Sequence, residues 1–172
     1  MAKYIAFLRG INVGKIRIKM IDLKVAFEKM GCTDVLMYLQ TGNVVFHADK
    51  TIEALKPILE KGLSDTFKYE AYVLLYPFEV LKAIIAACPY EAAETRHNYV
   101  MFISNPTIFD ELYTLSRGLG AEAKTIEAGE GVLYWQVPIG KTLDTPFAKL
   151  TAKAKYKSCV TVRNINTLEK MI

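Results

Sequence analysis

Residues 35–46 read VLMYLQTGNVVF, and this stretch decides the fold. Its first half alternates side chains with the period of two that is typical of a strand, and an apolar run resumes at Val44. Between the two runs, Thr41-Gly42-Asn43 forms a polar turn in which glycine permits a positive φ. The pattern predicts a β-hairpin.

The hairpin lies between two predicted strand and helix pairs. A strand at 4–8 and a helix at 19–30 precede it, and Gly31 stands where a C-cap glycine belongs. A helix at 51–65 and a strand at 69–75 follow it. The order β-α-β-β-α-β is that of a ferredoxin-like half.

The same order of elements recurs later in the chain. A helix at 77–87 is expected to connect the two parts. The elements predicted after it are a strand at 98–103, a helix at 106–116, strands near 122–127 and 132–137, a helix near 144–154 and a strand at 159–162. Asn166, with Glu169 three residues later, resembles a capping box and predicts the start of a last helix.

We therefore predict an α+β fold of two ferredoxin-like β-α-β-β-α-β halves packed together, with antiparallel or mixed sheets and helices on one face. Residues 1–76 are predicted to form the first half. Residues 77–172 are predicted to contain the connecting helix, the second half and the C-terminal helix.

Composition favours a soluble protein of the cytoplasm with no membrane partner. The 172 residues are 52% hydrophobic and 23% charged, as in globular folds, and no apolar run is long enough to span a bilayer. The opening apolar run is too short for a signal peptide. The three cysteines are odd in number and far apart, so we expect reduced thiols.

Net charge is +4, and the basic residues gather at the two ends of the chain. Residues 1–20 carry five lysines and arginines and no acidic residue, and residues 141–172 carry seven against two acidic residues. The segment between them is acidic. Such segregation is typical of an anion or nucleic-acid surface, although solvated charge also falls unevenly by chance.

Three segments carry a resemblance to a known family. They read FLRGINVG at 7–14, YLQTGNVVF at 38–46 and TVRNINT at 161–167, and Cys88-Pro89-Tyr90 is also in register. From its first strand to its last helix, the chain resembles the bacterial domain-of-unknown-function family numbered sixteen ninety-seven. The resemblance implies paired ferredoxin-like halves and a bacterial cytoplasm, and it implies no activity, cofactor or catalytic residue.

The chain departs from the family pattern at three positions. Lys15 stands where the family usually has a second glycine, Thr41 replaces a serine, and Ile165 replaces an aromatic residue. These changes put in doubt any role that needs a flexible glycine at 15 or stacking at 165.

The glycine-rich loop at 10–15 does not fit a phosphate-binding P-loop. Three residues instead of four separate its glycines, and Ile16 follows Lys15 where magnesium binding needs a serine or threonine. Its backbone amides, with Arg9 and Asn12, could still hold an anion between a strand and a helix. A purely structural turn is the alternative.

Catalytic and metal sites find little support in the sequence. The two histidines, His47 and His97, do not lie at ligand spacing from a cysteine or carboxylate, and no nucleophile-elbow sequence occurs. We predict no catalytic residue, metal ligand or cofactor, and enzymatic activity stays uncertain, with the balance against it.

Polar loop residues are the candidate binding groups. Arg163 and Asn164 lie between a strand and a helix, as the Arg9 loop does, so the two loops could form one bipartite basic surface. The alternative is that Arg163 pairs with a carboxylate and the asparagines satisfy backbone ends. The full candidate set is Arg9, Asn12, Gly14, Lys19, Gln40, Asn43, Arg163 and Asn164.

The best hypothesis for the function is a non-catalytic cytosolic protein that binds a small anionic or phosphorylated ligand. One alternative is a nucleic-acid-binding protein that uses the same basic ends, although the strand after Thr41-Gly42-Asn43 offers Phe46 alone for base stacking. Another alternative is a protein-interaction module that forms a homodimer.

Overall fold

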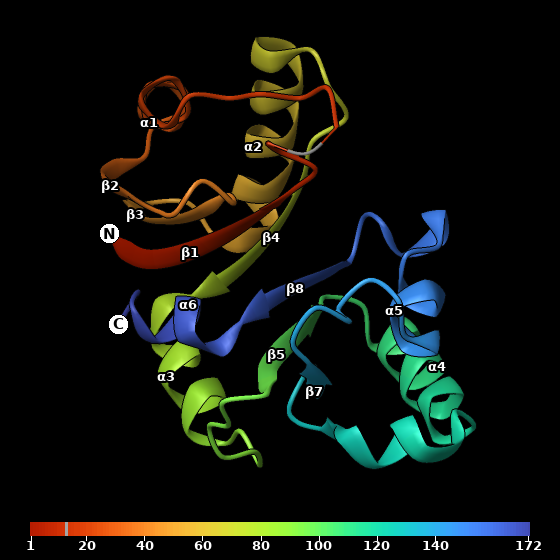
Figure 1. The fold of residues 1–172 in the computed structure, drawn as a ribbon. Coiled ribbons are helices and arrows are strands. Elements are labelled where there is room, and N and C mark those ends of the chain that lie inside the picture. The colour runs from red at the N-terminus through yellow and green to blue at the C-terminus, as the bar shows by residue number, and fades with distance from the viewer. Residues whose placement is uncertain (13) are drawn as a thin grey trace. The chain divides into compact units, whose positions relative to one another are not determined.

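A computed structural model describes residues 1–12 and 14–172 (Figure 1). Val13 of the FLRGINVG motif lies outside the described residues. The chain divides into two compact units, Met1–Leu81 with Met171 and Lys82–Lys170 with Ile172. Each unit contains one four-stranded antiparallel sheet with helices between its strands, so the predicted two-half α+β fold is confirmed.

The first unit has the β-α-β-β-α-β order. Its elements are β1 (Ala2–Arg9), α1 (Met20–Lys29), β2 (Thr33–Tyr38), β3 (Asn43–Ala48), α2 (Ile52–Phe67) and β4 (Tyr72–Pro77). The strands lie in the order β2-β3-β1-β4, which is the order of a ferredoxin-like sheet.

Helices α1 and α2 cover one face of this sheet (Figure 1). Phe27 from α1 and Leu59 from α2 are fully buried, and they pack in one cluster with Phe46 of β3. The Phe27 and Phe46 rings meet edge to face, with their centroids 5.4 Å apart. The buried apolar side chains of α1 and α2 therefore form the core of the first unit together with β3.

The hairpin between β2 and β3 requires its glycine. Gly42 has a φ of +78°, and its carbonyl accepts a hydrogen bond from the amide of Leu8 at 2.8 Å. A Cβ at this position would lie 2.8 Å from the Cβ of Leu8 and 3.0 Å from Cδ1 of Ile11. Both the conformation and the close approach of β1 exclude a side chain here.

The second unit repeats the element order after the connecting helix α3 (Phe78–Ala86). Its strands lie in the equivalent order β6-β7-β5-β8. The elements are β5 (Arg96–Ile103), α4 (Pro106–Arg117), the 3-10 helix η1 (Gly120–Thr125), β6 (Ile126–Ala128), β7 (Val132–Pro138), α5 (Pro146–Thr151), the 3-10 helix η2 (Ala154–Tyr156), β8 (Val160–Asn164) and α6 (Ile165–Glu169).

The core of the second unit lies between its sheet and helices α4 and α5. Leu112 of α4 and Phe147 of α5 are fully buried in one cluster with Trp135 of β7. The Trp135 and Phe147 rings meet edge to face at 5.4 Å. On α3, the carbonyl of Ile84 accepts a hydrogen bond from the Tyr134 hydroxyl at 2.5 Å, which ties the end of α3 to β7.

The strand predicted near 122–127 is wrong over most of its length, because residues 120–125 form η1 and β6 has only three residues. The Arg117 guanidinium donates to the carbonyls of Ala123 and Ile126 and holds the chain in a tight turn. The Glu122 carboxylate accepts from the amide of Phe147 at 2.8 Å, at the start of α5. Tertiary hydrogen bonds therefore override the local pattern.

The capping box predicted at Asn166 is also wrong. The N-cap of α6 is Asn164, whose Oδ1 accepts from the amide of Asn166 at 2.9 Å. The helix therefore starts one residue before Asn166. Within residues 1–12 and 14–172, no helix has the length and apolar character that a membrane span requires.

Candidate functional site

Asn12 holds the β1–α1 loop onto the hairpin of the first unit. Its Nδ2 donates to the carbonyl of Gln40 at 2.8 Å, and its Oδ1 accepts from the amide of Ile18 at 2.9 Å. Its φ of +53° is a conformation that asparagine tolerates better than most residues. The structure brings two candidate residues, Asn12 and Gln40, together, but the Asn12 amide is used for structural hydrogen bonds.

Asn43 also has a structural environment. It is buried, with 1% exposure, and its Nδ2 donates to the carbonyl of Tyr38 at 3.0 Å and to Oγ1 of Thr41 at 2.7 Å. These bonds close the hairpin turn. The amide at this position stabilises the turn and is not presented to solvent.

The remaining candidates of the first unit lie around an exposed basic loop, which we define as residues 14–19. Gly14 is exposed with a φ of +58°, and Lys19 is exposed immediately before α1. Arg17 and Lys15 are also exposed, and in the part of the chain that the structure describes none of the three cations forms an ion pair. Arg9 ends β1 and is half-buried.

Arg163 and Asn164 lie at the end of β8 in the second unit. Nη1 of Arg163 donates to Oγ1 of Thr161 at 2.7 Å and to the carbonyl of Val162 at 2.9 Å, and Asn164 caps α6. β8 is an edge strand, whereas Arg9 belongs to the central strand β1. The two loops therefore occupy different positions in the repeated topology, and a shared basic surface stays a prediction.

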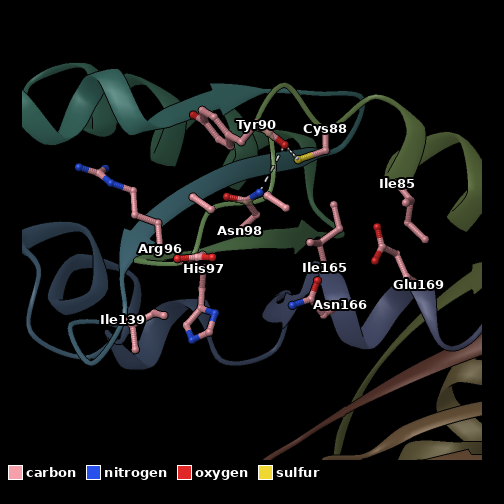
Figure 2. Close-up of a pocket in the computed structure, with 13 residues that line it drawn as sticks. Ile85, Cys88, Tyr90, Arg96, His97, Asn98, Ile139, Ile165, Asn166 and Glu169 are labelled. Atoms are coloured by element: carbon pink, nitrogen blue, oxygen red, sulfur yellow. Dashed lines mark hydrogen bonds between the residues drawn. The ribbon is translucent and has the colours of Figure 1, made fainter.

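A pocket of about 350 Å³ lies within the second unit (Figure 2). It is formed by the end of α3, the segment before β5, the first residues of β5, the residue after β7, and α6. Its lining residues are Ile85, Cys88, Tyr90, Ala92, Ala93, Glu94, Arg96, His97, Asn98, Ile139, Ile165, Asn166 and Glu169.

Asn98 builds one wall of the pocket. It is buried, with 7% exposure, and its Nδ2 donates to the carbonyls of Tyr90 at 3.3 Å and Glu91 at 3.1 Å. Its Oδ1 accepts from Nε2 of Gln136 at 2.9 Å. The Asn98 amide therefore fixes the segment before β5 against the sheet, and both of its donor hydrogens are already used.

Other polar side chains of the pocket keep their hydrogen-bonding capacity. In the described ranges, the side chains of Arg96, His97 and Asn166 form no hydrogen bond or ion pair, and the His97 ring only meets the Tyr99 ring edge-on at 5.9 Å. Figure 2 shows His97 on the β5 side, and Asn166 and Glu169 together on α6. These are the groups that can contact a ligand.

The thiol of Cys88 is not prepared for nucleophilic chemistry. Its pKa is raised, chiefly by burial; the hydrogen bond to the Tyr90 carbonyl lowers the pKa in part, and the negative charge of Glu169 raises it by a smaller amount. Its Sγ contacts the carbonyl of Tyr90 at 3.8 Å. At neutral pH the thiol is protonated, and it forms a weakly polar part of the wall. Nor do the residues 1–12 and 14–172 gather three His, Cys, Asp or Glu side chains that could hold a metal ion.

Sequence reasoning did not select the residues that line this pocket. In the sequence, His97 stands out only as a possible metal ligand and Glu169 only as part of a predicted capping box, and no pattern singles out Arg96 or Asn98. A signal was present, because the Cys88-Pro89-Tyr90 and TVRNINT segments that carry the family resemblance both reach the pocket. Only the fold shows that these distant segments meet.

The structure thus defines an α+β protein of two four-stranded units with a pocket in the second unit. The sequence profile of DUF1697, a family described as proteins of unknown function, matches residues 1–134. The chain belongs to this family. No curated protein matches it.

Solved structures also match the chain. The conserved bacterial protein SP0830 from Streptococcus pneumoniae is 21% identical, with a TM-score of 0.79 over 99% of this chain and 96% of that one. This likeness supports the fold alone. An unknown protein from Galdieria sulphuraria is 11% identical over 95% of this chain and 98% of that one, and its TM-score of 0.28 supports no argument.

Proposed function

We propose that the protein is a non-catalytic binding protein for a small anionic or phosphorylated ligand, held in the pocket of the second unit. One observation carries the proposal: Arg96, His97 and Asn166 line one pocket, and their side-chain donors have no partner in the described ranges. Guanidinium, imidazole and amide N–H groups are the usual donors to carboxylate and phosphate oxygens.

The size of the pocket fits a small molecule. A volume of about 350 Å³ lies near the lower end of the range for ligand sites, about 300 to 1,000 Å³. Apolar side chains, including Ile85, Ile139 and Ile165, supply part of the lining. The pocket therefore combines apolar side chains with several polar and charged ones, so it can contact both parts of a small polar ligand.

The non-catalytic part of the proposal rests on Cys88. It is the thiol among the lining residues, and its pKa is raised, chiefly by burial and less by the charge of Glu169, although its hydrogen bond to the Tyr90 carbonyl acts in the opposite direction. Catalytic thiols have the opposite property, because a neighbouring cation or helix N-terminus lowers their pKa.

A thermal-shift experiment tests the proposal with inorganic phosphate, glutarate and glucose 6-phosphate, because a ligand that binds only the folded state raises Tm. We expect at least one probe to raise Tm, and Arg96→Gln to abolish the shift. Lys149→Gln is the matched control, since it removes one exposed positive charge of the same unit outside the pocket. A shift that survives Arg96→Gln, or no shift with any probe, contradicts the proposal.

A second candidate function is nucleic-acid binding by the basic loop. Its support is the exposure of Lys15, Arg17 and Lys19 on a loop that Asn12 holds in place. Affinity for a single-stranded oligonucleotide should then fall steeply with salt, and neutralising the three cations should lower the slope of log K against log salt by about 2. A salt-independent affinity, or an unchanged slope, contradicts this candidate.

Homodimer formation stays a prediction.

A further inference from the structure

We infer that the preferred ligand of the second-unit pocket is zwitterionic: a short aliphatic molecule with an anionic group at one end and an ammonium group at the other, the ammonium being bound by Glu169. This inference rests on the proposed function, and it names the chemical class of the ligand. It follows from the charges that line the pocket.

The pocket contains charges of both signs. Arg96 and His97 contribute donors from β5, whereas Glu94 and Glu169 contribute two carboxylates. A ligand with negative charge at both ends would place one of its anionic groups near a carboxylate, which is unfavourable. An ammonium group at that end of the ligand would instead be attracted to the carboxylate.

Of the two carboxylates, Glu169 is the one that lies on α6, whereas Glu94 precedes β5, the strand of Arg96 and His97. The charge of Glu169 raises the pKa of the Cys88 thiol, so the carboxylate acts on a second group of the same wall. Figure 2 shows its side chain beside Asn166 on α6, across the pocket from His97 on β5. In the described ranges the Glu169 carboxylate accepts no hydrogen bond, and its oxygens can accept from an ammonium group.

The middle of the ligand is expected to be apolar. Ile85, Ile139 and Ile165 line the pocket together with Ala92 and Ala93. Methylene groups between the two charged ends would be removed from water against these side chains.

The experiment compares two probes that differ only at one end. In 4-aminobutyrate an ammonium takes the place of one carboxylate of glutarate, and both molecules have three methylene groups. The dissociation constants are measured from backbone amide NMR shifts of the full chain at constant ionic strength. The wild type and the variants Glu169→Gln, Glu130→Gln and Arg96→Gln are titrated with both probes. Glu130 is exposed and outside the pocket, so its variant controls for net charge.

We expect the wild type and Glu130→Gln to bind 4-aminobutyrate about five-fold more tightly than glutarate, and Glu169→Gln to lose this preference. Arg96→Gln should weaken both probes. A wild-type preference for glutarate, or an unchanged preference in Glu169→Gln, overturns the zwitterion inference but leaves the proposed function intact. If neither probe shifts the amides of the pocket residues, the proposed function fails as well.

Discussion

The two units have the same strand order but differ in the connection between their first strand and first helix. In the first unit, residues 10–19 connect β1 to α1 and contain the basic loop. In the second unit, Ser104 and Asn105 alone connect β5 to α4, and Asn105 Oδ1 accepts from the amides of Thr107 and Ile108. The same topology therefore supports an exposed cationic loop in one unit and a short capped turn in the other.

The second unit differs again before its first strand and after its last. Asn98 ties the segment before β5 to the sheet, and α6 follows β8 directly, so both reach one pocket. The repeated strand order thus explains the fold, whereas the non-repeated segments supply the candidate sites. A ligand site in one unit therefore does not imply an equivalent site in the other unit.

The largest effect is expected at the equivalent hairpins. Gly42→Ala should lower the free energy of unfolding by about 3 kcal/mol, because it combines a positive φ with contacts to Leu8 and Ile11. Gly131→Ala, between β6 and β7, should cost about 1 kcal/mol, since its φ is also positive but nothing lies within 4 Å of the added Cβ. Urea denaturation followed by circular dichroism measures both values.

Equal losses for the two alanine variants would show that the close approach of β1 to Gly42 adds nothing to the conformational strain. Our claim that tighter packing makes the Gly42 hairpin more sensitive than the Gly131 hairpin would then be contradicted.

A smaller effect is expected at the two asparagines that organise the equivalent connections. Asn12→Ala should cost about 2 kcal/mol, because two side-chain hydrogen bonds are lost. Asn105→Ala should cost about 1 kcal/mol, the usual value for an N-cap. Denaturation curves of both variants measure these losses. Asn12→Gly, which removes the side chain but tolerates the positive φ, separates the contribution of the hydrogen bonds from that of backbone strain. If Asn12→Gly is as stable as the wild type, Asn12 does not stabilise the loop through its amide.

The smallest effect is expected at two thiols, one in each unit. Burial raises the pKa of Cys32 to about 11, and it also raises the pKa of Cys88, together with the charge of Glu169. Glu169→Gln removes the like charge, so the pKa of Cys88 falls and its thiolate fraction at pH 8 rises. We expect iodoacetamide to modify Cys88 about two-fold faster in this variant, because a small fall in the thiol pKa raises the thiolate fraction by about this factor.

The first-unit thiol provides the internal control for that experiment. Cys32 is 2% exposed, and its pKa is raised by burial alone, so Glu169→Gln should leave its slow rate unchanged. Equal acceleration of both thiols would indicate a general loosening of the protein. An unchanged rate at Cys88 would contradict the assigned influence of Glu169 on the pocket wall.

The sequence predicts the parts of the fold that depend on local periodicity and turn chemistry. The hairpin around Gly42, the helix near 19–30 and the recurrence of the element order all follow from these patterns and are confirmed. The strand near 122–127 is wrong because Arg117 and Glu122 form hydrogen bonds to residues that periodicity does not consider.

The candidate site is predicted less well, because asparagine side chains serve ligands and backbone equally. For Asn12, Asn43 and Asn164 the sequence leaves open both a binding role and a structural one, and in the structure each forms hydrogen bonds to its own chain. The pocket depends on Asn98 and α6, which lie far apart in sequence. Only the folded sheet brings them together.

The most direct test is a backbone amide NMR titration of the full chain with glutarate and, separately, with 4-aminobutyrate, in which the two regions are observed at once. We predict shift changes at Arg96, His97 and Asn166 that saturate with the concentration of at least one of these probes, and none of comparable size in residues 15–19. Changes confined to residues 15–19, or no saturable change with either probe, would contradict a ligand site in the second unit.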